Sequence, residues 1–368
     1  MRNITRISAL LLAGALTFAL ASCGGAPVET TTEPLSTTTA ATTTAETTTA
    51  EPTTVATEVT TETTTETTTE AATTTEETTT EETTTEAPKP TISAEDITNH
   101  AELPLWGETT APHMIERPNR PSMTPTIVPY VVEGADAAVI IYPGGGYYQL
   151  SWDSEGKEIA KAYNEKGISA FIVRYRYYPY AAGDGILADG QRAVQFVRYY
   201  AEDFGIDPEK IAVCGFSAGG HLAMAVAQHA PEENLIGDAI GEVSAAPNAC
   251  ILCYPVTTFE PGTSSGSTPL NFLGKDNVNN ADLIAKYSYG YNLAAMPDTF
   301  IWYSEKDTTV DPAKNSVALA NALVAIGTNV QCIAYSDAGH GVGLASTYNN
   351  ASKWHAASVD FLTAAFAE

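Results

Sequence analysis

The chain has 368 residues, a hydrophobic content of 44% and a formal net charge of −26. Its 18 Lys and Arg residues are outnumbered by 44 Asp and Glu residues and form no basic stripe, which disfavours nucleic-acid binding. The length allows one α/β domain with a sizeable core, in addition to a long N-terminal segment of different composition.

The N-terminus has the pattern of a secretory signal peptide. Arg2 and Arg6 precede an uncharged apolar stretch that is too short for a membrane-spanning helix. The Leu-Ala-Ser-Cys sequence ending at Cys23 resembles the lipobox of bacterial lipoproteins, in which this cysteine becomes the lipidated N-terminus. Plain secretion with cleavage after a small residue is the alternative. We expect an extracellular protein on a bacterial cell surface, with the lipid anchor as its only membrane contact.

Residues 23–90 are rich in Thr, Glu and Ala. This composition offers too few large apolar side chains to offset the entropy of ordering, and its carboxylates repel one another. We therefore predict a disordered linker, whose threonines are either glycosylated or left as a bare solvated spacer. The predicted organisation is a signal peptide over 1–22, a linker over 23–90 and a globular domain over 91–368.

Strand-length apolar runs alternate with helical patterns in the globular part. The expected strands are 137–142, 168–175, 211–214, 249–253, 299–303 and 330–335, and the expected helices are 154–166, 187–204, 218–229, 312–326 and 351–366. Such alternation predicts an α/β fold, with a mostly parallel twisted sheet covered by helices on both faces. Ligands bind such sheets at the carboxyl ends of the strands, so catalytic residues are expected in the loops that follow strands.

The sequence Gly-Phe-Ser-Ala-Gly-Gly at residues 215–220 lies between an expected strand and an expected helix. A Gly-x-Ser-x-Gly pattern in this context is typical of a nucleophile elbow, where flanking glycines leave room for a sharp turn at the serine. Ser217 is therefore the predicted nucleophile, and an ordinary turn serine is the alternative. The N–H of Ala218, at the helix start, is a predicted donor to an oxyanion.

A serine nucleophile needs a base, and the base needs a carboxylate to orient it. Of the six histidines, His340 alone lies in a Gly-flanked loop after a strand, and it is the predicted base. Asp307 follows another strand and is the predicted acid, whereas Asp311 begins a helix and is better explained as its cap. His221, four residues after the serine, is expected to be a packing or capping residue.

The sequence Pro-Gly-Gly-Gly-Tyr at residues 143–147 follows the first expected strand. Its glycines allow the backbone to approach a ligand and to aim its N–H groups at an oxyanion. A phosphate-binding loop is a poor alternative, because the lysine and hydroxyl of such loops are missing. Neither a metal nor an organic cofactor is implied.

Four cysteines lie in the globular part, and each is expected to be a small buried residue. They are Cys214, Cys250, Cys253 and Cys332. Cys250 and Cys253 stand three apart in one strand, so they point to opposite faces and form a poor redox or zinc pair. A disulfide between distant cysteines stays open.

The polar insertion at 262–291 is expected to form either a partial cap over the substrate or a solvated surface loop.

Together these motifs resemble those of the α/β-hydrolase carbohydrate esterases, in the branch of bacterial acetyl xylan esterases and bifunctional acetyl/feruloyl esterases. The resemblance covers nearly all of residues 103–368. It implies an α/β-hydrolase fold with Ser217, His340 and Asp307 as the catalytic triad. It also implies that Gly145 and Gly146 complete the oxyanion hole with Ala218. The segments that carry the resemblance include the Gly-rich loop, the elbow, Glu155-Gly156, Asn271-Phe-Leu-Gly274 and Gly339-His-Gly341.

The resemblance implies a serine esterase that removes acetyl or feruloyl groups from plant cell-wall polysaccharides such as xylan. Its expected partner is the acylated polysaccharide or oligosaccharide, and no obligate protein partner is indicated. A peptidase of the prolyl-oligopeptidase type is one alternative, although such enzymes commonly carry a bulky aromatic where Ala218 stands. A catalytically silent fold that binds carbohydrate is another alternative, and the presence of all three candidate triad residues argues against it.

Overall fold

The computed structural model describes residues 91–115, 122–229, 234–264 and 266–367. The predicted signal peptide, the predicted linker and Cys23 lie outside these residues. Among the described helices, none is both long and apolar enough to cross a membrane.

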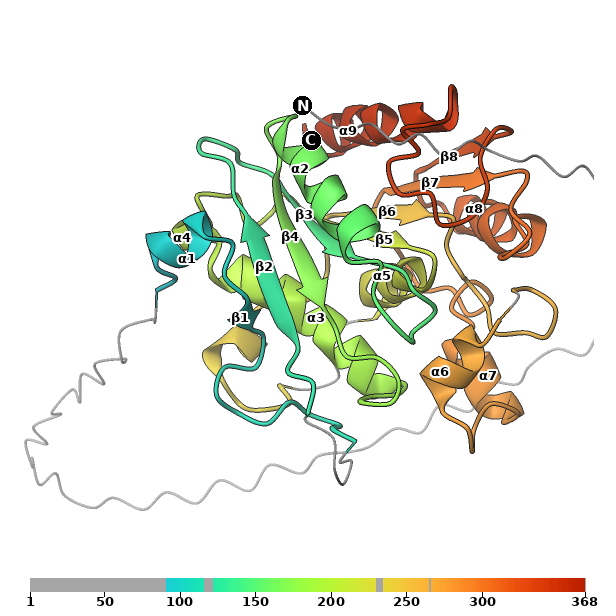
Figure 1. Cartoon of the computed structure of the whole chain (residues 1–368), viewed down its shortest axis with the longest axis horizontal. Helices are drawn as coiled ribbons and strands as arrows, with labels where there is room; N and C mark the ends of the chain where they lie inside the picture. Colours follow the sequence, from blue (N-terminus) through green and yellow to red (C-terminus); the bar gives the residue numbers. More distant parts are fainter. Residues whose placement is uncertain (1–90, 116–121, 230–233, 265, 368) are drawn as a thin grey trace, which may run out of the picture. The chain divides into compact units, whose positions relative to one another are not determined.

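A sheet of eight strands forms the centre of the described domain, in the order β1-β2-β4-β3-β5-β6-β7-β8 (Figure 1). The strands from β3 to β8 pair in parallel, whereas β2 is antiparallel to both β1 and β4. The prediction of a mostly parallel sheet is confirmed. The strands are β1 (Leu103–Pro104), β2 (Thr126–Tyr130), β3 (Ala138–Tyr142), β4 (Ser169–Arg174), β5 (Ile211–Phe216), β6 (Ala249–Cys253), β7 (Thr299–Ser304) and β8 (Val330–Tyr335).

Helices cover both faces of this sheet, with α2 and α9 on one face and α3, α5 and α8 on the other (Figure 1). Three of the expected helices begin with a π-helical or 3-10 turn, labelled η. The helices are α1 (Ala94–Thr98), α2 (Glu158–Asn164), α3 (Asp184–Tyr199), α4 (Ala201–Phe204), α5 (Ala218–Gln228), α6 (Thr268–Leu273), α7 (Ala281–Tyr287), α8 (Ala318–Ala325) and α9 (Trp354–Ala365), and the turns are η1 (Asp153–Lys157), η2 (Ala239–Glu242), η3 (Ala313–Val317) and η4 (Ala351–Lys353).

Strand β3 illustrates how the two layers form. Ala138, Ile140 and Tyr142 pack into the cluster shared with α3 and α5, whereas Val139 and Ile141 pack into the cluster shared with α2 and α9. Side chains alternate between the faces of a strand, and every residue of β3 is buried. A strand buried on both faces therefore appears in the sequence as an unbroken apolar run.

The cysteines follow the expectation with one exception. Cys250 and Cys253 lie in the two opposite clusters, and Cys214 is also buried. Cys332 is exposed, so its predicted burial is wrong. It lies on β8, which ends the sheet order and whose residues are only partly covered. All four thiols are free.

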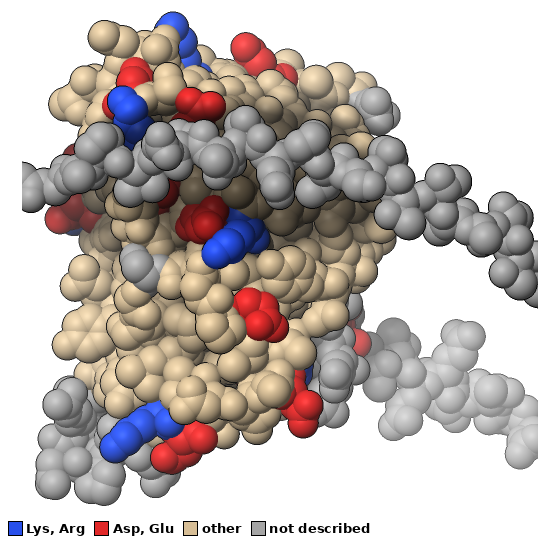
Figure 2. All heavy atoms as spheres, turned by 90° about the vertical axis from the view of Figure 1, so that its right-hand side faces the viewer, with Lys and Arg blue, Asp and Glu red and all other residues tan. Residues whose placement is uncertain are grey.

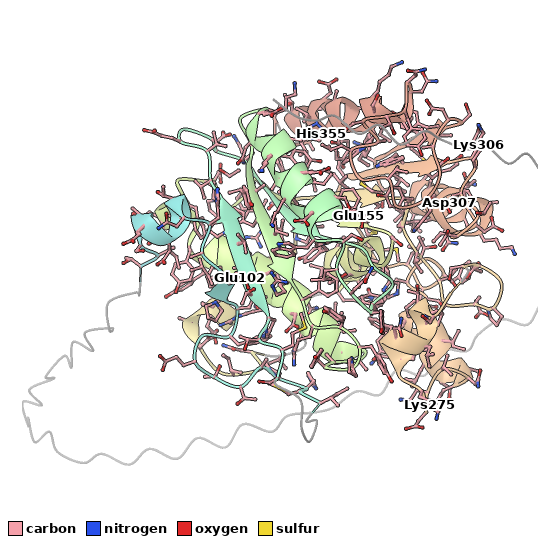
Figure 3. The ribbon with its side chains drawn as sticks, viewed as in Figure 1. Glu102, Glu155, Lys275, Lys306, Asp307 and His355 are labelled. Carbon is pink, nitrogen blue, oxygen red and sulfur yellow. The ribbon has the colours of Figure 1, made fainter. Side chains whose placement is uncertain are left out.

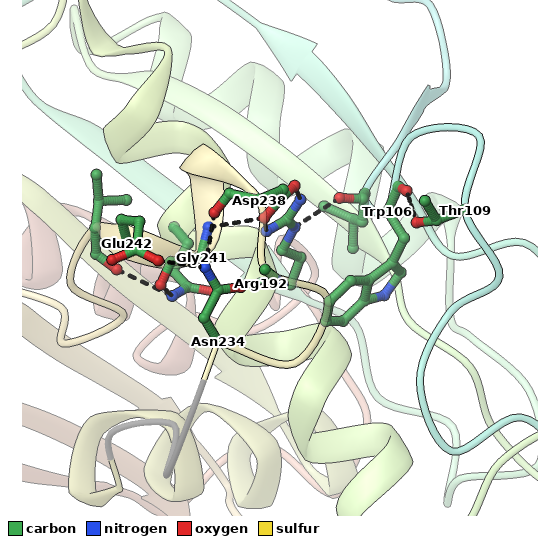
Figure 4. Close-up of polar contacts among 11 residues, drawn as sticks. Trp106, Thr109, Arg192, Asn234, Asp238, Gly241 and Glu242 are labelled. Carbon is green, nitrogen blue, oxygen red and sulfur yellow. Dashed lines mark hydrogen bonds and ion pairs between the residues drawn. The ribbon is translucent and has the colours of Figure 1, made fainter.

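An ion pair fixes the loop before η2 onto α3 (Figure 4). The Arg192 guanidinium, 1% exposed, donates two hydrogen bonds to the Asp238 carboxylate and a third, of 2.8 Å, to the carbonyl of Leu105. The guanidinium also lies over the Trp106 ring, 4.9 Å from its centroid. This arrangement satisfies a buried charge with fixed partners, as structural ion pairs require.

Candidate active site

Ser217 occupies the sharp turn between β5 and α5, with φ 51° and ψ −116°. A residue other than glycine rarely adopts a positive φ, and such a strained backbone persists only where surrounding contacts hold it. Here the Ser217 N–H donates to the carbonyl of Cys253 at 3.0 Å, and its own carbonyl accepts from Val256 at 3.1 Å. A Cβ on Gly219 would lie 2.0 Å from the carbonyl oxygen of Tyr142. Only glycine fits there, as the elbow prediction requires.

The structure brings Ser217, His340 and Asp307 together from the loops after β5, β8 and β7. His340 Nε2 lies 2.8 Å from Ser217 Oγ, and His340 Nδ1 lies 2.6 Å from Asp307 Oδ2. An ionised carboxylate can only accept, so Nδ1 carries the proton and Nε2 is left to accept from the serine hydroxyl. This is the tautomer that a base for Ser217 needs.

Asp307 is held in place by its own turn. Its Oδ1 accepts hydrogen bonds of 2.9 Å from the N–H groups of Thr309 and Val310. Its side chain is 2% exposed, and it lies directly after β7 (Figure 3). Asp311 instead accepts from the N–H groups of Ala313 and Lys314 at the start of η3. Asp311 is thus a helix cap, as the sequence indicates.

His221 lies near the elbow but is fully engaged in packing. Its Nε2 lies 2.8 Å from the carbonyl oxygen of Tyr287, and its Nδ1 lies 2.9 Å from the hydroxyl of Tyr147. The carbonyl can only accept, so Nε2 carries the proton and the Tyr147 hydroxyl donates to Nδ1. Burial lowers the pKa of His221 to about 4, which keeps the ring neutral. Neither ring nitrogen is free to relay a proton.

The Gly-rich loop after β3 passes beside Ser217. The Gly144 N–H donates to Glu155 Oε2 at 2.9 Å, and Asn271 Nδ2 donates to the carbonyl of Gly146 at 2.8 Å. Across residues 91–115, 122–229, 234–264 and 266–367, the N–H groups of Gly145, Gly146 and Ala218 have no acceptor. Unpaired backbone donors at a helix start are suited to binding an anionic oxygen.

The insertion between β6 and β7 packs against this loop. Phe272 of α6 contacts the Tyr147 ring at a centroid distance of 4.8 Å, and the carbonyl of Tyr287 in α7 accepts from His221. Both aromatic side chains of the insertion are buried. These contacts favour the partial cap over the solvated loop.

Two residues near the site, Glu155 and Tyr254, were not singled out as functional from sequence. Glu155, in η1, is 2% exposed, and its Oε1 accepts a hydrogen bond of 2.7 Å from the Tyr254 hydroxyl. Burial raises the pKa of this carboxyl group. A glutamate at the start of an expected helix normally indicates a solvated position. Its place shortly after the Gly-rich loop and its position within a segment that carries the family resemblance were the signals that indicated otherwise.

Three further observations concern the described residues outside the hydrogen-bonded relay. Within the described part of the chain, no three His, Cys, Asp or Glu residues are grouped so as to hold a metal ion. A small hollow lined by Trp106, Arg192 and Leu235 includes none of the three residues of the hydrogen-bonded relay. On the side of the domain that carries α6, α7 and α8, the visible acidic and basic side chains are scattered among uncharged ones (Figure 2).

The sheet order, the helical layers and the serine turn define an α/β hydrolase. The solved structure of MGS-M1, an alpha/beta hydrolase enzyme from a Medee basin deep-sea metagenome library, shares this fold at a TM-score of 0.51. That likeness has 24% identity and covers 69% of this chain and 98% of that chain. Residues 127–323 match the BD-FAE family, and the chain belongs to this family of carboxylic-ester hydrolases.

Two relatives have names that concern xylan chemistry. An acetyl ester-xyloside bifunctional hydrolase from Caldicellulosiruptor lactoaceticus is 30% identical, with a TM-score of 0.66 over 72% of this chain and 96% of that chain. An acetylxylan esterase from Xylanibacter ruminicola is 29% identical over 213 residues, which are 57% of this chain and 42% of that protein. The chain therefore spans less than half of this curated relative. The predicted resemblance is confirmed.

Proposed function

We propose that this esterase uses Ser217 to hydrolyse acetyl esters on xylan-type polysaccharides. The observation that carries the proposal is the relay from Asp307 through His340 to Ser217, with hydrogen bonds of 2.6 and 2.8 Å. The unpaired N–H groups beside the serine support it, as do the names of the two relatives.

In the proposed first half-reaction, Ser217 Oγ attacks the ester carbonyl carbon and its proton passes to His340 Nε2. The negative charge that develops on the carbonyl oxygen is stabilised by the N–H groups of Ala218, Gly145 and Gly146. Asp307 stabilises the imidazolium. When the C–O bond to the sugar breaks, His340 returns the proton to the sugar oxygen, leaving acetylated Ser217.

The second half-reaction repeats these steps with water. A water molecule gives one proton to His340 Nε2 and its oxygen attacks the acyl carbon. The tetrahedral intermediate then collapses, and the proton on His340 returns to Ser217 Oγ. Acetic acid leaves, and at neutral pH it ionises to acetate. The enzyme regains its starting state, so no cofactor is consumed.

The test compares wild type with Ser217→Ala on acetylated xylan and on feruloylated arabinoxylan, with release of acetate and ferulate measured on one preparation. We expect wild type to release acetate and Ser217→Ala to lose at least about a thousandfold in kcat. Full activity in Ser217→Ala would overturn the mechanism. Ferulate release exceeding acetate release would change the substrate assignment.

The two rival functions have their own readouts. A fluorophosphonate probe should label Ser217 in wild type, whereas a silent carbohydrate-binding fold would remain unlabelled. Cleavage of a proline-containing peptide at a rate above that of the acetyl ester would favour a peptidase. We expect labelling and no such preference.

We further propose that the protein is anchored at the bacterial cell surface through Cys23. The support is the lipobox-like sequence alone. Palmitate incorporation into the full chain, and its loss in Cys23→Ser, would support the anchor. Equal partition of both proteins into the aqueous phase of a detergent extraction would contradict it.

A further inference from the structure

Glu155 stands out because it is a buried carboxyl group to which the proposed mechanism gives no role. It lies in the π-helical turn η1, and such turns are frequent at functional sites. Its Oε2 accepts from the N–H of Gly144 at 2.9 Å, and its Oε1 accepts from the Tyr254 hydroxyl at 2.7 Å. These two donors are neutral, and so is the Ser151 side chain, which also forms a hydrogen bond with the carboxyl group. Burial among neutral partners disfavours the ionised form of a carboxyl group, a cost that a neutral side chain of the same size would not carry.

Tyr254 extends the contacts of Glu155 to the loop that carries His340. Its hydroxyl accepts a hydrogen bond of 3.0 Å from the N–H of Gly343, and its ring makes a T-shaped contact with the His340 ring at 5.0 Å between centroids. Tyr254 itself has φ 39°, a strained conformation for a side chain of this size. The strain shows that surrounding contacts hold this tyrosine in one place.

The turn η1 therefore touches both loops that the chemistry needs. Through Glu155 it fixes Gly144, whose neighbours supply the oxyanion donors. Through Tyr254 it fixes Gly343, and the carbonyl oxygen of Ser154 is so close to Gly343 that a Cβ there would lie 2.5 Å away. A shift of about 1 Å between catalytic loops can cost a hundredfold in rate.

We propose that Glu155 is a positioning residue for the ester hydrolysis. It holds the Gly-rich loop and the His340 loop at a fixed separation, and its negative charge stabilises the imidazolium that forms on His340. This inference rests on the proposed function of Ser217 and His340. It assigns to a residue outside the triad an effect on both geometry and charge.

The titratable groups around Glu155 support a role for its charge. They are His340, Tyr254, Tyr175 and Cys253. Burial raises the pKa of both tyrosines and of the cysteine well above their ordinary values, so these three stay neutral at neutral pH. Burial also raises the pKa of Glu155, and the positive charge of His340 opposes that shift. The carboxylate and the imidazolium therefore favour one another.

The decisive variant is Glu155→Gln, made in the full chain, because it keeps the size of the side chain and removes its charge. We expect kcat to fall about tenfold or more with little change in KM, since the loss concerns the transition state. We also expect the acidic limb of the kcat/KM profile to move to lower pH, because the imidazolium loses a nearby negative charge. A merely structural role would leave that limb in place.

Tyr254→Phe tests the geometry, since it removes the hydrogen bond to Glu155 Oε1 and the link to Gly343 while Glu155 itself is kept. It should lower kcat without moving the acidic limb to lower pH. Tyr163→Phe is the matched control, because its buried hydroxyl bonds Ser358, away from the site, at 2.9 Å. The control should keep the wild-type kcat.

An unchanged kcat and an unmoved acidic limb in folded Glu155→Gln would overturn the inference. If that variant does not fold, Tyr254→Phe decides, and a wild-type kcat in it would equally overturn the link between loops. Ser217→Ala is measured alongside. Full activity in Ser217→Ala contradicts the proposed function, whereas a loss of at least about a thousandfold in Ser217→Ala together with a fully active Glu155→Gln contradicts only the role of Glu155.

Discussion

Asn271 Nδ2 donates a hydrogen bond of 2.8 Å to the carbonyl oxygen of Gly146, which lies 125 residues earlier in the chain. Asn271 belongs to α6 in the insertion, and its side chain also bonds Ser267 Oγ at 3.0 Å. Gly146 has φ 63°, so the orientation of its peptide groups depends on such contacts. The insertion thereby helps to aim a proposed oxyanion donor.

Removal of this contact tests that relationship. Asn271→Ala should lower kcat about tenfold, because the Gly146 peptide loses its anchor and the oxyanion donor becomes less well aligned. Asn277→Ala is a matched control, since its side-chain amide donates to the carbonyl of Leu273, at 3.3 Å, within the same insertion. Steady-state kinetics on an acetyl ester provide the measurement. Equal losses of kcat in both variants would contradict a specific role for Asn271.

Asp307 and Asp311 offer a paired test of the acid. Asp307→Asn should reduce kcat roughly ten-thousandfold, because an amide that donates to Nδ1 favours the wrong tautomer of His340. Asp311→Asn should keep nearly wild-type kcat, since asparagine caps a helix about as well as aspartate. The comparison uses kcat at neutral pH. A larger loss in Asp311→Asn than in Asp307→Asn would reverse the assignment.

The elbow predicts an unusual response to alanine. In a helix, Gly→Ala normally stabilises by up to about 1 kcal/mol. Gly219→Ala should instead destabilise by about 1–3 kcal/mol, because the new Cβ would meet the carbonyl of Tyr142. A methyl group at Gly339 would meet only open space, so Gly339→Ala should change the free energy of unfolding by less than about 0.5 kcal/mol. Urea unfolding distinguishes the two; a stabilised Gly219→Ala would refute the packing argument.

Buried histidines should make the fold sensitive to acid. Burial lowers the pKa of His355 to about 4 from an ordinary value of 6.5, so the folded protein binds this proton less readily than the unfolded chain. The part of the folding stability that depends on a neutral His355 ring is fully present above about pH 6.5 and is lost as the pH falls toward 4. The quantity to follow is the unfolding free energy of His355→Leu minus that of wild type. This difference should rise by roughly 2 to 3 kcal/mol when the pH is lowered from 7.5 to 4.5.

His221 is retained in both proteins, so its own titration cancels in this comparison. His355 Nε2 has no hydrogen-bond partner among the described residues, which is why leucine is a tolerable replacement. Urea titrations at several pH values supply the free energies. A difference between the proteins that does not change with pH would contradict the prediction.

Much of the fold could be predicted because its central strands are buried on both faces. The apolar runs at β3, β5 and β6 identify those strands directly, and the glycines of the elbow identify the turn at Ser217. The residues of the relay were predictable because each follows a strand. The distances between these residues in space could not be predicted, since they depend on the strand order, which a single sequence does not specify.

The remaining differences have local causes. β2 was not predicted, because Pro129 interrupts its apolar run and proline normally argues against a strand. The helices α6 and α7 are too short to show a helical period. The expected helix at 187–204 begins earlier, at Asp184, and is divided near Tyr200 into α3 and α4. Burial of Glu155 follows only from tertiary contacts.

The hydrogen bond between α6 and the Gly-rich loop has a consequence for redesign. A peripheral excursion that only lined the substrate could be exchanged to alter selectivity while turnover is left intact. Here the insertion also carries the side-chain amide of Asn271, so a graft that lacks this amide should lower the reaction rate as well. Engineers who wish to vary one without the other must keep residue 271 and its path to the glycines unchanged.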